Sequence, residues 1–221
     1  MPAGHVQRVL RGLFARWGLP GALRVDNGSP WGSWSDLPPP LALWLVGLGR
    51  EVLWNPPRRP QRNGVVERSQ GVAQAWAEPG RCQAVAELQA RLDEEDRVQR
   101  EEYPHELGRP RLAVYPGLAH SGRRYSRAWE GRHWSWARVL EHLGGYVVPR
   151  RVDRSGKLGL YGGKLYVGTV HARARVAVQF DAAAAQWVVS GPGGAEVCRR
   201  PLDQLSPAML RDLDHAERPR R

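Results

Sequence analysis

Two carboxylates in the first third of the chain, Asp26 and Glu67, lie next to backbone elements that could hold them for catalysis. Asp26 follows a short apolar run at residues 22–25, a predicted strand, and opens an Asn-Gly turn. Glu67 lies in the first turn of a helix predicted from residue 65. The C-terminal end of a strand is where α/β folds place their chemistry, and the loop before the helix could close over a ligand. The simpler interpretations are a turn aspartate and a favourable charge at a helix N-terminus.

The elements around the two carboxylates indicate α/β architecture. Residues 3–17 have the apolar spacing of a helix, which Gly18 and Pro20 end. A second helix is predicted over residues 38–48 and a second strand over 51–54, before a loop rich in proline and arginine. The order helix, strand, helix, strand, helix could return the start of the last helix to the end of the first strand. Asp26 and Glu67 would then share one site.

Two longer segments carry a resemblance to a known family. RVDNGSPW (residues 24–31) and WNPPRRPQRNGVVERSQG (residues 54–71) resemble the second and third catalytic motifs of retroviral integrases and of integrase-core transposases from bacterial insertion sequences. The matching positions are Asp26, Asn27 and Gly28 in the first segment, and Pro57, Pro60, Asn63, Gly64, Glu67 and Arg68 in the second. The resemblance covers residues 1 to about 115. It implies an α/β fold, a partial ribonuclease-H-like core, in which Asp26 and Glu67 are catalytic and bind two Mg²⁺ ions for phosphoryl transfer on DNA.

The chain departs from this family at its start. The family's first catalytic aspartate precedes the second motif, on the first strand of the core, whereas residues 1–25 here contain neither Asp nor Glu. The resemblance therefore implies that the first strands are missing, through a broken gene, a late start or a separate polypeptide. We expect the 221-residue chain by itself not to cleave or transfer DNA strands with Mg²⁺ or Mn²⁺, because each carboxylate helps to position the ions. Strand transfer of a labelled transposon end measures this, and metal-dependent activity that Asp26→Ala abolishes would contradict it.

The charge of the chain predicts a polyanionic partner. The formal net charge is +11, and Lys157 and Lys164 are the only lysines, so almost all of the positive charge is arginine. Arginine binds phosphate oxygens through two parallel hydrogen bonds. A GC-rich genome would explain the use of arginine in place of lysine, but not the excess over acidic residues. The residues predicted to bind DNA are Arg58, Arg59, Arg62, Asn63, Arg68, Arg123, Arg124, Arg127, Arg150 and Arg151. Arginine runs are also common on solvated surfaces, so that alternative stays open.

From Tyr146 onward, the sequence pattern changes from helical to β-rich. Five short β-rich runs separated by glycine turns predict a small antiparallel barrel-like domain, which resembles the DNA-binding β-domain that follows the core in such transposases. The predicted runs are 146–148, 158–161, 165–167, 176–180 and 187–190. The predicted division is a catalytic-core part over 1–115, a basic connector over 116–145, a β-barrel-like DNA-binding domain over 146–202 and a basic tail over 203–221.

These observations predict a DNA transposase or integrase fragment. The alternative is a non-catalytic DNA-binding module or remnant with a vestigial acidic pair. Double-stranded DNA, as transposon ends and target, is the expected partner, and the resemblance implies a homo-multimer. No apolar run reaches the roughly 20 residues that cross a bilayer, and two distant cysteines fit a reducing cytoplasm. Trp31 and Trp34, in the loop after Asp26, could stack on a DNA base or pack under the helices.

Overall fold

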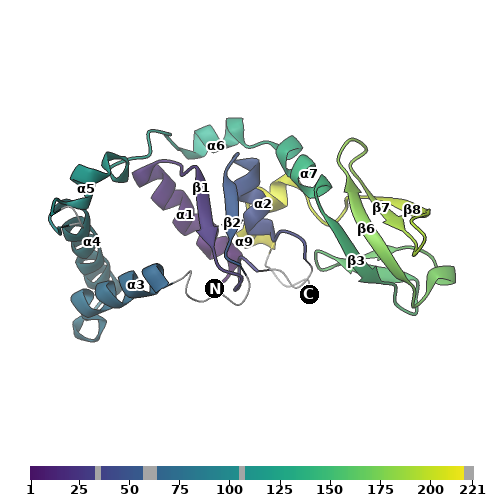
Figure 1. Ribbon diagram of the computed structural model, residues 1–221, viewed down its shortest axis with the longest axis horizontal. Helices are drawn as coiled ribbons and strands as arrows, with labels where there is room; N and C mark the ends of the chain where they lie inside the picture. Colours follow the sequence, from purple (N-terminus) through teal and green to yellow (C-terminus); the bar gives the residue numbers. More distant parts are fainter. Residues whose placement is uncertain (33–35, 57–63, 105–107, 217–221) are drawn as a thin grey trace. The chain divides into compact units, whose positions relative to one another are not determined.

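The computed structural model describes residues 1–32, 36–56, 64–104 and 108–216 (Figure 1). Contacts divide the chain into two compact units. Unit 1 contains residues 1–11, 21–54 and 127–221, and unit 2 contains residues 12–20 and 55–126. The first helix, α1 (Ala3–Trp17), contributes residues to both units.

Unit 1 contains most of the strands. Its elements after α1 are β1 (Ala22–Val25), α2 (Pro40–Gly47), β2 (Glu51–Trp54), α6 (Arg127–His133), α7 (Trp136–Gly144), β3 (Val147–Arg151), β4 (Lys157–Leu160), β5 (Gly163–Tyr166), the 3₁₀ turn η4 (Thr169–His171), β6 (Arg175–Asp181), β7 (Gln186–Ser190), β8 (Glu196–Pro201), α8 (Pro207–Arg211) and α9 (Leu213–Ala216). Unit 2 is helical where it is described. Its elements are the end of α1, α3 (Gly64–Ala77), η2 (Pro79–Arg81), α4 (Val85–Glu101), α5 (Arg111–Val114) and η3 (Pro116–Leu118).

Strands β1 and β2 pair in parallel, with Ala22 opposite Glu51 and Val25 opposite Trp54. Helix α2 connects them, so the three elements form a β-α-β unit, the usual connection between parallel strands. Helix α2 is apolar on every side and its leucines are fully buried, as expected for a helix enclosed by other elements. Pro40 begins it at a position where the missing N–H costs nothing, and Gly49, with φ +71°, ends it in the left-handed region. The predicted helix and both predicted strands are confirmed here.

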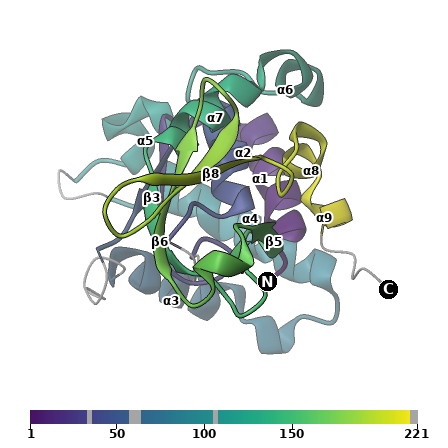
Figure 2. The ribbon, with the colours of Figure 1, turned by 90° about the vertical axis from the view of Figure 1, so that its right-hand side faces the viewer.

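The C-terminal strands form an antiparallel sheet in the order β3-β6-β7-β8 (Figure 1), and Figure 2 shows β3, β6 and β8 from another side. Alternation buries one side of each central strand: Val176, Val178 and Phe180 of β6 face the core. Strands β4 and β5 form a separate two-stranded ladder. The antiparallel pairing predicted for this region is confirmed. Barrel-like closure is not seen: the strands of this fully described region make an open four-stranded sheet and a hairpin, and the edge strand β8 was absent from the prediction.

The antiparallel sheet does not pack by itself. Trp187 and Phe180 share one continuous buried cluster with Val139 and Leu143 of α7 and with Leu43 of α2. The hydrophobic core therefore runs across residue 146, where the sequence predicts a domain boundary. The class of the fold is mixed α and β, as predicted. The predicted domain limits themselves stay predictions.

The predicted connector is more ordered than its irregular, basic sequence suggests. It contains α6, which the prediction missed, and Glu130 on this helix is only 1% exposed. The Glu130 carboxylate receives two hydrogen bonds from the Arg11 guanidinium, at 2.7 and 3.1 Å, and one from Nε1 of Trp44, at 3.1 Å. This buried group joins α1, α2 and α6 of unit 1. A buried carboxylate needs such partners because its desolvation is costly.

Within unit 2, the end of α1 contacts α4. The guanidinium carbons of Arg16 and Arg100 lie 4.5 and 4.2 Å from the ring centroid of Trp17. Arg16 also forms an ion pair with Asp93 of α4 at 3.0 Å. Several acidic residues of α4 pair with arginines three or four residues away on the same helix, as on a solvated helix face. Across the described residues, the helices are too short or too polar to cross a membrane.

Candidate active-site carboxylates and DNA-binding surface

Asp26 lies at the carboxyl end of β1, where open α/β sheets bind their ligands. Its side chain is exposed, and Oδ1 accepts a hydrogen bond from the Gly28 N–H at 3.0 Å. A Cβ on residue 28 would lie 3.4 Å from both carboxylate oxygens, so glycine leaves space beside the charge. Within the described chain, no ion pair involves Asp26. The turn interpretation and the ligand interpretation both fit this geometry, because Oδ2 stays available when Oδ1 holds the turn.

Glu67 lies in the first turn of α3, as predicted, and its side chain is exposed. The helix dipole favours a carboxylate at this position. Glu67 belongs to unit 2 and Asp26 to unit 1, so the predicted closeness of the two carboxylates stays a prediction. The predicted loop before α3 lies outside the described residues, and with it Pro57, Arg58, Arg59, Pro60, Arg62 and Asn63.

The two carboxylates fit Mg²⁺ by donor type, because both are exposed oxygen ligands. The transposase family that the sequence resembles uses three carboxylates, and Asp26 and Glu67 are only two. Among the described residues, no group of three or more His, Cys, Asp or Glu side chains is arranged to hold a metal. Asp26 and Glu67 therefore remain candidate ligands for part of a site, and the structure supplies no third one from the described chain.

The other predicted DNA-binding residues occupy different kinds of positions. Arg68 on α3 and Arg124 are exposed. Arg123 donates its Nε–H to the Leu19 carbonyl at 2.8 Å within unit 2, and Arg127 pairs with Glu130 at 3.3 Å within unit 1. Both arginines have structural contacts, and the Glu130 carboxylate offsets part of the charge that Arg127 can offer to a ligand. Arg150 donates to the Pro149 carbonyl at 2.7 Å, at the end of β3 beside the exposed Arg151.

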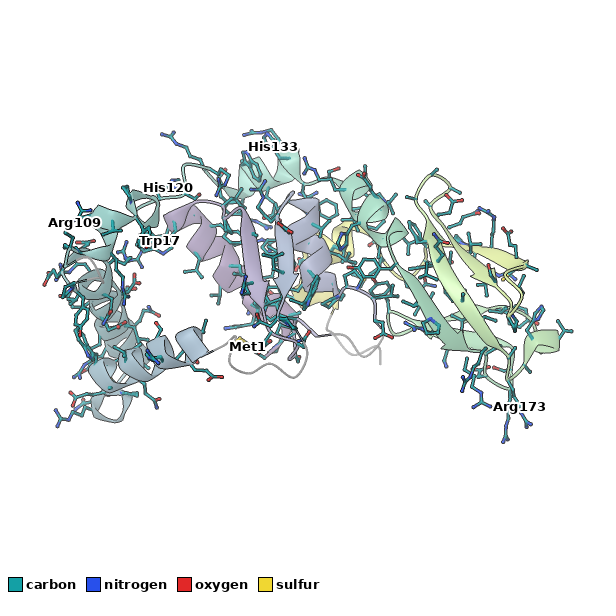
Figure 3. All side chains as sticks on the ribbon, in the orientation of Figure 1. Met1, Trp17, Arg109, His120, His133 and Arg173 are labelled. Carbon is teal, nitrogen blue, oxygen red and sulfur yellow. The ribbon has the colours of Figure 1, made fainter. Side chains whose placement is uncertain are left out.

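The structure adds two arginines to Arg151 that the prediction missed. Arg151 is the register partner of Arg175 on β6, and Arg173 lies two residues before Arg175, at the same end of the sheet (Figure 3). We call Arg151, Arg173 and Arg175 the arginine corner. All three are exposed, and none forms an ion pair in the described part of the chain. No local sequence pattern could have found them, because Arg151 and Arg175 come together only through the β3–β6 register.

The arginine corner is electrostatically unfavourable without a ligand. Like charges directly opposite each other in a sheet are destabilising. Arg173 also has φ +66°, a left-handed backbone that costs a non-glycine residue free energy. The neighbouring Asp153 forms no ion pair with these arginines in the described part of the chain. It accepts hydrogen bonds from the Lys157 N–H and from the hydroxyl and N–H of Ser155, which lower its pKa to about 2, and it pairs with Lys164 at 3.6 Å. An anion bound between the arginines would relieve their repulsion.

A cavity of about 260 Å³ opens beside Asp26 in unit 1. Its walls include Asn27 and Trp31 from the turn after β1, Trp54 at the end of β2, and Tyr146 just before β3. The cavity is thus at the same edge of the parallel strands as the candidate carboxylate. Trp34, the other tryptophan of this loop, lies outside the described residues. No protein-family model matches the chain.

Proposed function

We propose that this chain acts on DNA as part of an integrase-core transposase with a ribonuclease-H-like core. The observation that carries the proposal is the β1-α2-β2 unit, which leaves the exposed Asp26 carboxylate at the end of a parallel strand. Helix α3 then opens with Glu67. This order of elements agrees with the order that the two sequence motifs require.

In this proposal, Asp26 and Glu67 would hold Mg²⁺ together with a third carboxylate, which the resemblance implies on the first strand of the core. Bound Mg²⁺ would stabilise charge on the phosphate oxygens of the DNA. The hydrogen bond from the Gly28 N–H orients the Asp26 carboxylate. Because Gly28 has no side chain, access to both carboxylate oxygens stays open. The guanidinium groups of the arginine corner would bind phosphate oxygens of the DNA backbone through pairs of hydrogen bonds.

A second function rests on a different observation. The arginine corner belongs to an ordered sheet and needs no metal, so a non-catalytic DNA-binding module would use it equally well. Among the described residues, no three potential metal ligands lie together, which agrees with this candidate. The two functions differ in whether Asp26 and Glu67 share a metal ion.

Iron-directed backbone cleavage separates the two functions. Fe²⁺ bound in place of Mg²⁺ generates hydroxyl radicals with ascorbate and peroxide, and these cut the nearby main chain. We expect cuts near both residue 26 and residue 67 of the full chain, and we expect Asp26→Asn to abolish both, because one ion contacts both carboxylates. Gel mapping of the fragments gives the result.

Glu141→Gln is the matched control, because Glu141 is an exposed carboxylate on α7. This variant is expected to keep both cuts. Cuts near residue 67 that survive Asp26→Asn would show that the two carboxylates do not share a metal, and the catalytic proposal would fail. Failure of the chain to bind duplex DNA at low salt would remove both functions.

A further inference from the structure

The cavity beside Asp26 has walls of two different chemical kinds. Trp31, Trp54 and Tyr146 are half-buried aromatic residues at its surface. Asn27 and Asp36 add an amide and a carboxylate. Aromatic rings combined with a few hydrogen-bonding groups are typical of sites for planar, polar ligands. All of these residues belong to unit 1, so the cavity lies within one compact body.

Hydrogen bonds hold the aromatic walls in place. Nε1 of Trp54 donates to the Trp31 carbonyl at 2.9 Å, which ties the turn after β1 to the end of β2. The Trp31 N–H in turn donates to the Gly28 carbonyl at 2.8 Å. Tyr146 shares a hydrogen bond of 3.3 Å with Nε2 of His142, and burial raises the pKa of its hydroxyl, which stays neutral. These contacts fix the three aromatic walls of the cavity within unit 1.

The size and charge of the cavity limit its ligand. Its volume of about 260 Å³ lies below the roughly 300–1,000 Å³ typical of sites for drug-sized molecules, so it suits one small ring system. The Asp36 carboxylate at the wall repels a phosphate and attracts an N–H donor. Asp36 has φ +55°, a left-handed backbone that Asp tolerates better than most residues. A nucleobase with an exocyclic amino group meets these conditions.

We infer that this cavity receives one unstacked base of the DNA strand on which the chain acts. The inference rests on the proposed function, because it assumes a DNA substrate. The cavity wall begins at Asn27, the residue after Asp26, so the bound base would belong to a nucleotide close to the phosphate that the carboxylate serves. Aromatic stacking binds bases of any sequence, and Asn27 and Asp36 would add a preference for the amino-bearing bases.

Binding of matched duplexes to the full chain tests this inference. A blunt duplex is compared with the same duplex carrying one unpaired adenine or cytosine at one end, and with one carrying an abasic nucleotide there. We expect the unpaired base to tighten binding by roughly 5- to 150-fold, the range expected for one stacked base. The abasic nucleotide should give no gain. Fluorescence polarisation of labelled DNA measures the affinities.

Variants of the cavity wall locate the effect. Trp31→Ala should abolish the gain and leave the affinity for the blunt duplex unchanged, whereas Trp31→Phe, which keeps a ring, should retain part of it. Trp76→Ala is the matched control, because Trp76 is a 46% exposed tryptophan of α3 in unit 2. If Trp31→Ala does not fold, Tyr146→Leu provides the same comparison.

The outcomes separate this inference from the proposed function. No binding of the blunt duplex would overturn the proposed function. Binding of the blunt duplex with no gain from an unpaired base, or with a gain that survives Trp31→Ala and Tyr146→Leu, would overturn the inference and leave the proposed function standing.

Discussion

Replacement of the three arginines of the corner with glutamine is expected to weaken duplex binding by orders of magnitude at low salt. Each arginine that contacts a phosphate releases counterions, so each lost contact lowers the slope of log affinity against log salt by about 0.9. For the triple variant Arg151→Gln, Arg173→Gln, Arg175→Gln, the slope of log affinity against log salt concentration should become shallower by up to about 2.7, because up to three phosphate contacts are removed. Titrations of the full chain from about 50 to 200 mM salt measure both slope and affinity.

The control for this variant removes the same charge from other sites. Arg8, Arg97 and Arg199 are arginines that already form ion pairs with Asp214, Glu94 and Asp181. Their triple replacement with glutamine lowers the net charge equally, and surface pairs of this kind contribute little to stability. Equal losses of affinity in the two triple variants would mean that total charge, and not the arginine corner, binds the DNA.

Removal of the Glu130 carboxylate should give the second large effect, on stability. Glu130→Ala is expected to lower the free energy of unfolding of unit 1 by about 3–5 kcal/mol, because it leaves the Arg11 guanidinium, of which only 13% is exposed, without its buried partner. It also removes the acceptor for Nε1 of Trp44, a fully buried side chain. Urea unfolding followed by near-ultraviolet circular dichroism measures the change.

Two further variants make this prediction specific to the buried pair. Glu141→Ala on the exposed face of α7 should change the stability by no more than about 0.5 kcal/mol. The double variant Arg11→Met, Glu130→Leu should be more stable than Glu130→Ala, because no unpaired charge remains buried. A loss below about 1 kcal/mol in Glu130→Ala would show that solvent already screens the pair.

The local pattern of the chain predicted most of its elements. Helix α1 and strands β1 and β2 match the predicted limits, because apolar periodicity and the stops at Gly18 and Gly49 act over a few residues. The antiparallel pairing of strands that follow one another, such as β4 with β5 and β6 with β7, was also predictable, since short turns leave no length for a crossover. The placement of Asp26 at a strand end and of Glu67 in a first helical turn is local in the same sense, and the prediction of both is confirmed.

The tertiary structure decided what depends on residues far apart in the sequence. The apolar periodicity of the sequence could not reveal α6, because the residue that this helix buries is the charged Glu130. Its partners, Arg11 and Trp44, come from distant segments of the chain. The arginine corner exists only through the β3–β6 register, which sets Arg151 opposite Arg175. The continuous core under α2, α7 and the antiparallel sheet likewise depends on how three separate apolar faces meet. Long-range pairing of this kind is set by the combined burial of many side chains, whereas the patterns read from sequence record only neighbours along the chain.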